Sequence, residues 1–396
     1  MNDTSTKQKP YIKFCLVTTS PLIVQFFLIP HLRKLVQHYE VTLIVNEDCS
    51  KLLAHESLEA IEMKIIPIKR KISPFTDLIS FFKLFIFFRQ RKFNAIVTVA
   101  PKAGLLGILA ATLAGCRIRC HIFQGEVWAN KHGVKKWLLK SLDKLMASFA
   151  THLLVVSQSE RTVLIKEGVI EAEKSKVIGA GSICGVDTNR FHFDKKRRAE
   201  LRAEIGVSEQ ALLILYLGRV TKDKGVSDLA QAWNSLANRH SNLHLAIVGP
   251  DEGNLKAEIT NLVSRGNAGK IHFFGHTFHP EFWLTAADML ALPSYREGFG
   301  MVVIEAGSVG IPVVASRIYG ISDAMIDGVT GLTHTPGNIP ELERRLDKLI
   351  VTPSLRKQFG EAARTRVIRE FEQEVVIDQY ISYWESIISK TQTMKK

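Results

Sequence analysis

Short runs of apolar, often β-branched residues alternate along this chain with longer stretches whose apolar positions recur every three or four residues. The first kind of run predicts a strand, and the second predicts an amphipathic helix. In the first half of the chain the predicted strands lie at 11–17, 41–45, 63–68, 95–99, 117–123 and 152–156. Regular alternation of this kind is typical of a parallel sheet covered by helices on both faces.

A polar stretch at 189–210, which contains the charged run DKKRRAE, interrupts the alternation and predicts an exposed connection. The pattern then resumes, with predicted strands at 212–218, 243–249, 270–275, 288–292 and 311–316. A length of 396 residues suits two domains of α/β class, each a doubly wound sheet. We expect a first domain at 1–185, a linker at 186–210, a second domain at 211–370, and a C-terminal helix at 371–396 that packs back on the first domain.

The net charge of +13 is distributed unevenly. Residues 1–185 hold 26 Lys and Arg against 14 Asp and Glu, whereas residues 186–396 hold 26 against 25. The first half therefore attracts anions, and the candidate partners are a nucleic acid, an anionic membrane surface or a phosphorylated acceptor. A basic, solvated surface without a partner is the alternative.

The five cysteines are irregularly spaced and form no CxxC pair, which predicts neither a disulfide framework nor a zinc site and favours a reducing compartment. The N-terminal residues are polar and unlike a signal peptide. The longest uncharged apolar stretch, 103–116, is shorter than the roughly 18–20 residues that span a bilayer. The sequence thus predicts a protein that is not integral to a membrane.

The segment LGRVTKDKGV places Arg219 at the end of a predicted strand and Lys224 just before a helix. Two cations beside the free N–H groups of a helix N-terminus can bind a diphosphate. Taken alone, the segment fits a solvated loop at least as well.

A second segment, PSYREGFGMVVIEAGSVGIPVV, sets Glu297 and Glu305 eight residues apart. Gly298 and Gly300 lie at its strand-to-helix turn, where glycines let the backbone approach a ligand closely. Glu305 falls one to two turns into a largely apolar helix, where an unpaired carboxylate would be costly. There it could accept hydrogen bonds from ribose hydroxyls.

The two segments together resemble the C-terminal domain of the family 4 retaining glycosyltransferases, which adopt the GT-B fold. The resemblance rests on GR-x₄-KG, on Glu297-x₇-Glu305, and on the order VGPDEGN, FFGHT and AADMLALPSYREGFG between and around them. It extends over essentially the whole chain and is most specific over residues 211–335. It implies two Rossmann-like domains facing each other across a cleft that holds the active site.

The resemblance also implies roles for individual residues. Arg219 and Lys224 would neutralise the diphosphate of a nucleotide-sugar donor and stabilise the leaving nucleotide. Glu305 would contact the ribose, and Glu297 would lie near the donor sugar. Further donor contacts are expected from Gly298, Phe299, Gly300 and Met301. His276, in FFGHT, would line the base pocket or serve as a structural loop residue. No cofactor and no metal ion are expected, because basic side chains and helix dipoles take over the work of a metal.

The first half departs from the family at two places. TTSPLIV replaces the usual glycine-rich turn after the first strand, and Gln124 stands before Gly125 where many relatives have a histidine. An amide cannot act as a general base, but in same-face transfer the leaving phosphate can accept the acceptor's proton. We therefore expect Gln124 and Glu126 beside the reaction centre. A purely structural loop is the alternative.

The stretch 68–93 combines several phenylalanines with basic residues at both ends, and 130–145 adds Lys131, Lys135, Lys136, Lys140 and Trp137. Aromatic residues flanked by cations suit an interfacial helix, although one phenylalanine stripe would equally suit packing on the sheet.

Together these features predict a retaining hexosyltransferase that moves a sugar from a nucleotide diphosphate, by family resemblance a UDP-sugar, to a lipid-linked saccharide. Such an enzyme would work in the cytoplasm, peripherally on the inner face of a bacterial membrane, in the synthesis of a surface polysaccharide such as lipopolysaccharide. A GT-B sugar-nucleotide epimerase is the alternative enzyme. A nucleic-acid-binding protein is disfavoured because no recognised module is present.

Overall fold

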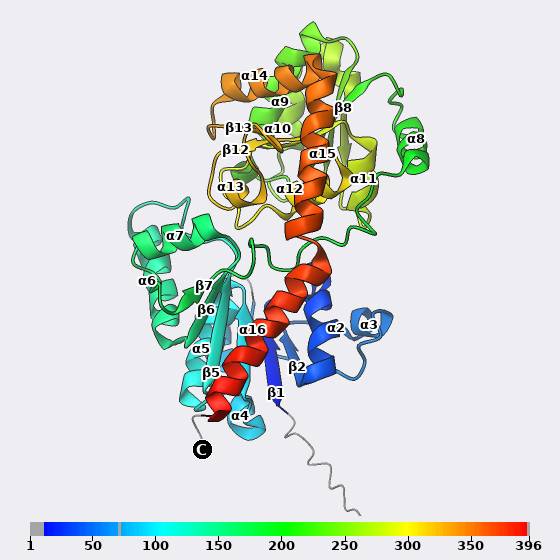
Figure 1. Ribbon diagram of the computed structural model, residues 1–396. Helices are drawn as coiled ribbons and strands as arrows, with labels where there is room; N and C mark the ends of the chain where they lie inside the picture. Colours follow the sequence, from blue (N-terminus) through cyan, green and yellow to red (C-terminus); the bar gives the residue numbers. More distant parts are fainter. Residues whose placement is uncertain (1–11, 70–72, 394–396) are drawn as a thin grey trace, which may run out of the picture. The chain divides into compact units, whose positions relative to one another are not determined.

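The computed structural model describes residues 12–69 and 73–393, so Tyr11 and residues 70–72 of the predicted segments lie outside the described residues. Contacts within the chain divide it into two compact units. The first unit consists of Met1–Val156, Arg161–Ile178 and Ile377–Lys396, and the second consists of Ser157–Glu160 and Gly179–Val376. Each unit is an α/β domain with one parallel sheet (Figure 1).

Within the described residues, the first unit has a seven-stranded parallel sheet with the order β3-β2-β1-β4-β5-β6-β7. The strands are β1 (Lys13–Val17), β2 (Glu40–Val45), β3 (Glu62–Ile65), β4 (Ala95–Val99), β5 (Ile118–Phe123), β6 (His152–Val155) and β7 (Ser175–Lys176). The helices are α1 (Pro21–Ile23), the π-helical turn η1 (Val24–Leu28), α2 (Ile29–His38), α3 (Ser50–His55), α4 (Pro74–Arg91), α5 (Pro101–Leu113), α6 (Gly133–Phe149), α7 (Gln158–Lys166) and α16 (Gln373–Thr393).

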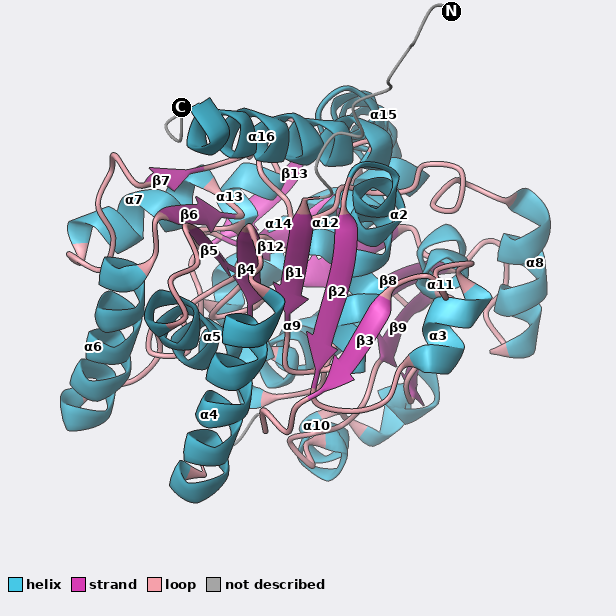
Figure 2. Cartoon of the chain, turned by 90° about the horizontal axis from the view of Figure 1, so that it is seen from below, coloured by secondary structure: helices cyan, strands magenta, loops and turns pink. Residues whose placement is uncertain are grey.

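Helices cover both faces of this sheet. Successive strand residues point to opposite faces, so Cys15 and Val17 join a core cluster that contains Leu84 of α4. On the other face Phe14 meets Trp384 of α16 edge to face, with ring centroids 5.5 Å apart. Figure 2 shows α4, α5 and α6 on one side of the strands and α2 with α16 on the other.

The second unit has, among its described residues, a six-stranded parallel sheet with the order β10-β9-β8-β11-β12-β13. The strands are β8 (Leu212–Leu217), β9 (Leu243–Val248), β10 (Ile271–Phe274), β11 (Met289–Leu292), β12 (Val313–Ser316) and β13 (Gly331–His334). The helices are α8 (Lys195–Glu204), η2 (Lys222–Lys224), α9 (Val226–Arg239), α10 (Lys256–Leu262), η3 (Arg265–Lys270), α11 (Pro280–Ala286), α12 (Met301–Val309), α13 (Ile321–Ala324), α14 (Ile339–Val351) and α15 (Pro353–Glu370).

The segment 186–210, expected as a linker, belongs to the second unit and contains α8. Asp194 caps this helix by accepting hydrogen bonds from the backbone N–H groups of Lys196 and Arg197. Arg202, almost fully buried, donates 2.7 Å hydrogen bonds to the carbonyl oxygens of Ala286 and Ser208. A charged helix can thus be part of a domain when its guanidinium groups satisfy backbone carbonyls that would otherwise be buried without partners.

The C-terminal residues are divided between the two units. Helix α16 starts at Gln373, and from Ile377 onward its residues belong to the first unit. There Tyr380 packs edge to face on His31 of α2, with ring centroids 4.8 Å apart. Elements from the first part of the chain and from α16 therefore pack together in the first unit.

Candidate active site

The loop after β8 belongs to the first of the two predicted donor-site segments. It is held in place where its backbone lies close to the loops after β9 and β11. Gly225 has φ of +66°, and a Cβ there would lie 2.1 Å from the carbonyl oxygen of Pro293. A Cβ on Gly249 would lie 1.9 Å from the carbonyl oxygen of Gly218. Both distances are below any van der Waals contact, so only glycine fits at these positions. The carboxyl ends of β8, β9 and β11 are thereby drawn together.

This approach brings Lys224 to Glu297. The Lys224 Nζ lies 2.6 Å from Glu297 Oε1, and Ser294 Oγ donates to the same carboxylate oxygen at 2.9 Å. Only 14% and 15% of the Lys224 and Glu297 side chains are exposed. The predicted diphosphate cation and the predicted sugar-side carboxylate, 73 residues apart, are therefore direct neighbours.

Arg219 lies in a more open setting. It forms an ion pair of 2.9 Å with Glu252, and both side chains are more than a third exposed. Its carbonyl oxygen accepts a 2.7 Å hydrogen bond from the fully buried Tyr216 hydroxyl. Asp223 is close to both cations. Burial acts to raise the pKa of Asp223, but the hydrogen bond from the Thr221 hydroxyl and the charges of Lys224, Arg296 and Arg219 outweigh it. The pKa of Asp223 is therefore lowered.

Tyr216, Asp223, Ser294 and Arg296 are members of this cluster that the sequence did not single out. Tyr216 looks like any apolar strand residue in LLILYLG, and Ser294 like any turn residue. Of these four residues, only Asp223 could have been noticed in the sequence, because it lies between Arg219 and Lys224 in the first motif.

The glycine loop GFG leads into α12. Gly300 is the N-cap of α12 with φ of +79°, and Met301 is the first residue of the helix. Phe299 is buried and packs edge to face on Phe371 at 5.4 Å. Its ring therefore supports the loop, and only its backbone can face a ligand. A Cβ on Gly320 would lie 2.5 Å from the carbonyl oxygen of Gly298, which holds the loop from its other side.

Glu305 lies in a different electrostatic environment. Burial raises its pKa to about 7, Arg190 acts to lower that pKa, and Glu281 acts to raise it further. Glu305 in turn raises the pKa of the Cys184 thiol, which burial has already raised. A carboxyl group that titrates near neutrality can be either a hydrogen-bond donor or an acceptor toward a hydroxyl ligand.

His276 is exposed, beyond the end of β10. Its ring packs edge to face on the exposed Phe278 at 4.7 Å. His276 therefore lies on an exposed loop.

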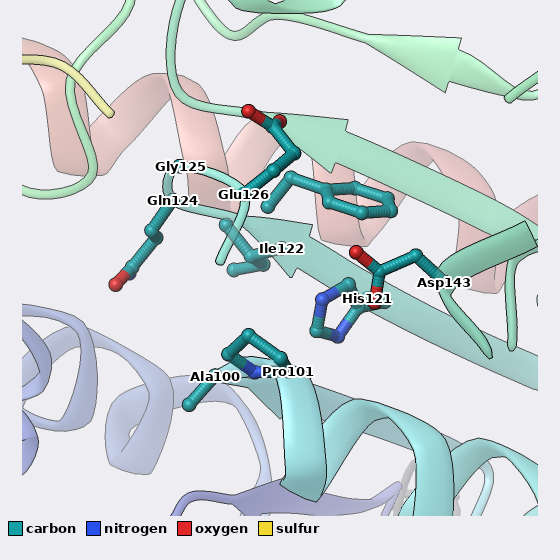
Figure 3. Close-up of a pocket in the computed structure, with 9 residues that line it drawn as sticks. Ala100, Pro101, His121, Ile122, Gln124, Gly125, Glu126 and Asp143 are labelled. Atoms are coloured by element: carbon teal, nitrogen blue, oxygen red, sulfur yellow. The ribbon is translucent and has the colours of Figure 1, made fainter. Parts of the chain in front are cut away.

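In the first unit Gln124, Gly125 and Glu126 follow β5 and line a cavity of about 90 Å³ (Figure 3). The Nε2 atom of Gln124 is buried without a hydrogen-bond partner among the described residues. Such a donor costs free energy unless a ligand satisfies it. Glu126 is almost fully buried. The structure thus brings both predicted residues to one cavity.

Two further residues of this cavity were not expected. Asp143 of α6 accepts a 2.8 Å hydrogen bond from Trp128 Nε1, and burial raises the pKa of Asp143 to about 7, with a further contribution from Glu126. His121 lies 2.9 Å from the Thr98 hydroxyl, and burial lowers its pKa to about 3. His121 is therefore a neutral, buried strand residue. Figure 3 shows its ring beside the Asp143 carboxyl group.

No group of three or more His, Cys, Asp or Glu side chains that could hold a metal ion occurs among residues 12–69 and 73–393. Within the same residues, no helix is long and apolar enough to cross a bilayer.

Comparison with known proteins decides the family. Residues 197–366 match the family described as "Glycosyl transferases group 1", and residues 31–181 match the "Glycosyl transferase 4-like domain". The chain belongs to the family 4 glycosyltransferases of the GT-B fold. The predictions of two Rossmann-like α/β domains and of a glycosyltransferase are both confirmed.

Three similar proteins illustrate the relationship. The capsular polysaccharide biosynthesis glycosyltransferase CapM of Staphylococcus aureus is 26% identical over 88% of this chain and 90% of its own length. The N,N'-diacetylbacillosaminyl-diphospho-undecaprenol alpha-1,3-N-acetylgalactosaminyltransferase of Campylobacter jejuni is 23% identical over 81% and 84%. The solved structure of Anabaena Alr3699/HepE in complex with UDP superimposes with a TM-score of 0.79 at 20% identity, covering 95% of this chain and 100% of that one.

Proposed function

We propose that this glycosyltransferase moves a sugar, with retention of anomeric configuration, from a UDP-sugar to a lipid-linked saccharide in the synthesis of a bacterial surface polysaccharide. The observation that supports the proposal is the ion pair between Lys224 and Glu297, the residue directly before the glycine loop Gly298–Gly300. It provides a cation for a leaving diphosphate directly beside a carboxylate that can meet the sugar. UDP is supported by the HepE complex, and the lipid-linked acceptor by the name of the Campylobacter relative.

The reaction uses the two units in different ways. In the second unit Lys224 and Arg219 bind the diphosphate, and Glu305 binds the ribose. The bond between the anomeric carbon and the phosphate oxygen breaks while a bond to the acceptor hydroxyl oxygen forms on the same face of the sugar. The acceptor proton passes to the leaving phosphate oxygen, so no general base is needed. Gln124, through its unsatisfied Nε2, donates a hydrogen bond that orients the reactants on the first unit.

A membrane surface is the proposed location of the acceptor. Helix α4 buries Ser80, Leu84 and Phe88 against the unit, yet its opposite side is also apolar. We define the α4–α6 face by the exposed apolar side chains of the two helices that flank α5: Phe75, Leu78, Ile79, Phe82 and Ile86 on α4, and Val134, Trp137, Leu138, Leu145 and Phe149 on α6. Each of the two helices thus carries a stripe of exposed apolar side chains, and exposed apolar surface of this extent marks an interaction site.

The two most exposed aromatic side chains of the α4–α6 face lie near the catalytic edge of the first unit. Phe75 is 77% exposed and Trp137 is 68% exposed, and both belong to the first two turns of their helices. Those turns follow the carboxyl ends of strands, the edge at which Gln124 also lies. Lys83, Lys135 and Lys144 accompany the apolar residues, which suits an anionic bilayer. We infer that the enzyme works peripherally on the inner face of the cytoplasmic membrane.

A donor screen followed by product analysis tests this function. Purified enzyme is incubated with UDP-, GDP- and ADP-sugars and a polyprenyl-diphosphate saccharide, and the new linkage is read by proton NMR. We expect turnover with a UDP-sugar and the same anomeric configuration in donor and product. Inversion would overturn the retaining mechanism. Interconversion of donor sugars without acceptor would favour the epimerase alternative.

A further inference from the structure

Asp143 of α6 lines the cavity beside Gln124, but it has no role in the proposed transfer reaction. Its Oδ2 accepts a 2.8 Å hydrogen bond from Trp128 Nε1, whereas its Oδ1 forms no hydrogen bond with any described residue. The Asp143 side chain is half-buried and keeps accessible surface, unlike Glu126 and His121, which are almost fully buried. One oxygen of the Asp143 carboxyl group is therefore available to a ligand in the cavity.

The hydrogen bond to Trp128 does not by itself explain a carboxyl group at position 143. Burial raises the pKa of Asp143 to about 7, so the surroundings disfavour its ionised form. The indole N–H of Trp128 needs one acceptor, and the neutral amide oxygen of an asparagine would supply it without that cost. A carboxyl group differs from this amide in its second acceptor oxygen. At Asp143 that second oxygen is the one without a partner among the described residues.

The other groups around the cavity indicate which ligand fits. Neither Lys nor Arg occurs among the described residues that line it, and burial lowers the pKa of His121 to about 3, which leaves its ring neutral. Glu126 adds a second carboxyl group, which also acts to raise the pKa of Asp143. An anionic ligand would therefore meet like charge without a counter-charge, whereas a hydroxyl group can donate to Oδ1.

The size of the cavity fits one part of a sugar. Its volume of about 90 Å³ has room for a few water molecules or for one edge of a sugar ring. Figure 3 shows the Asp143 carboxyl group beside the His121 ring, and the two groups form neither a hydrogen bond nor an ion pair with each other. A ligand hydroxyl group at Oδ1 would therefore displace no contact between them.

We propose that Asp143 is an acceptor-binding residue, whose Oδ1 accepts a hydrogen bond from a hydroxyl group of a neutral sugar in the cavity beside Gln124. This inference rests on the proposed glycosyl transfer and adds the class of acceptor. The sugar bound here offers a free hydroxyl group and is neither a uronic acid nor a sugar phosphate. The hydrogen bond from Trp128 holds the carboxyl group in place before the sugar binds, which reduces the entropy lost on binding.

Saturation-transfer NMR of the full-length protein tests the class of ligand. The probes are the methyl α-D-glycosides of glucose, galactose and mannose, and the methyl glycosides of the corresponding uronic acids. We expect at least one neutral glycoside to bind, and its uronic acid counterpart to bind about tenfold more weakly or less. Equal binding of the two, or binding of none of the neutral glycosides, would overturn the proposal. This comparison uses the unchanged protein alone, so it does not depend on whether a variant folds.

A pair of variants then isolates the Asp143 carboxyl group. Trp128→Phe removes only the indole N–H partner, and Asp143→Leu/Trp128→Phe removes both partners, so neither leaves a buried donor unsatisfied. We expect Trp128→Phe to bind the neutral glycoside within about threefold of the unchanged protein, and the double variant to bind it at least about tenfold more weakly. Glu59→Leu, which removes an exposed carboxylate of the same unit, should bind like the unchanged protein.

The outcomes separate this inference from the proposed function. Equal glycoside binding by Trp128→Phe and the double variant would show that Asp143 acts only by holding Trp128, even if the donor screen finds turnover. Glycoside binding that is lost in the double variant, together with a donor screen without turnover, would reject the transfer reaction while the sugar site remained.

Discussion

Lys224 Nζ and Glu297 Oε1 lie 2.6 Å apart, in an ion pair whose two side chains are mostly buried. Two partly buried charges must compensate each other's loss of hydration. Ser294 supplies a further hydrogen bond to the same carboxylate oxygen, so the carboxylate is held from two sides. An ammonium group has three donors, and Glu297 uses one of them. Lys224 can therefore bind a diphosphate oxygen without giving up Glu297.

The first prediction concerns the charge of Lys224. Lys224→Ala is expected to lower kcat by about 10²–10³, since it removes a charge aimed at the leaving group and leaves Glu297 buried without its partner. Steady-state kinetics with a UDP-sugar measure the change. Lys222→Ala is the matched control, because Lys222 is an exposed lysine of the same turn η2. An equal loss in both variants would show that the general charge of the turn matters and not the Lys224–Glu297 pair.

The second prediction separates two costs of replacing a glycine: the strain of a left-handed backbone and the clash of a Cβ with a neighbouring atom. Gly225 and Gly206 have nearly the same φ, +66° and +70°, but a Cβ at 225 would lie 2.1 Å from Pro293 O and a Cβ at 206 meets nothing within 4 Å. Gly206→Ala should cost about 1 kcal/mol, the strain of a left-handed alanine. Gly225→Ala should cost several times more and should also lower donor affinity, because the loop carrying Lys224 must move. Urea denaturation and titration with UDP measure the two effects. Equal costs at both positions would contradict the close approach.

The third prediction follows from Glu305. Its pKa is raised from 4.5 to about 7, so the folded protein holds this proton more tightly than the unfolded chain. Stability contributed by the neutral form is therefore present below about pH 4.5 and is lost as pH rises to about 7. Relative to Glu305→Gln, the unchanged protein should lose stability on the order of 2 kcal/mol between pH 5 and pH 8. Thermal midpoints in the two buffers measure this difference.

The same titration affects donor binding. The carboxylate accepts hydrogen bonds from ribose hydroxyls better than the neutral acid does, so UDP affinity should rise between pH 6 and pH 8. Glu305→Gln should flatten this rise, and Glu361→Gln, which changes an exposed glutamate of α15, should not. A rise that persists in Glu305→Gln would remove Glu305 from the ribose site.

Much of the fold followed from local sequence patterns. Strands such as β1 and β8 are buried on both faces, so their continuous apolar runs give an unambiguous signal. β7 and β13 were not predicted. The first has only two residues, Ser175 and Lys176, and the second contains polar Thr333 and His334, whose burial depends on neighbours distant in sequence.

The sequence predicted the candidate site residues but not their contacts with one another. The motifs named Lys224 and Glu297 separately, but their contact depends on how closely the β8 and β11 loops approach, which Gly225 and Pro293 determine. The same limit explains Phe299, whose ring packs on Phe371 more than seventy residues away. Long-range packing of this kind leaves no periodic trace in the sequence.

The fourth prediction tests the amide at position 124. Gln124→Ala should lower kcat by about tenfold to a hundredfold while UDP binding stays unchanged, because all the proposed UDP contacts belong to the second unit. Gln124→Glu should lower it further, since a carboxylate cannot donate the hydrogen bond that Nε2 supplies. Gln358→Ala, on the exposed side of α15, serves as the control. Unchanged turnover in Gln124→Ala combined with Glu126→Gln would show that this loop is structural.

The fifth prediction concerns the α4–α6 face. Phe75→Ser and Trp137→Ser together remove its two most exposed aromatic side chains and no charge. Burial of one such side chain in the membrane interface contributes about 1.5–3 kcal/mol, so the double variant should bind anionic vesicles at least tenfold more weakly. Cosedimentation with vesicles containing phosphatidylglycerol, at low and at physiological salt, measures the change.

Two controls make this membrane test specific. Phe278→Ser removes a phenylalanine that is 63% exposed in the second unit, and it should leave vesicle binding unchanged. Turnover with a water-soluble acceptor analogue should be the same in the double variant and the unchanged protein, because neither Phe75 nor Trp137 lines the cavity beside Gln124. Activity on a vesicle-embedded acceptor should fall with vesicle binding. If vesicle binding persists in the double variant, the exposed stripes of α4 and α6 do not hold this enzyme on the membrane, and the basic charge of the first unit must attract a different anion.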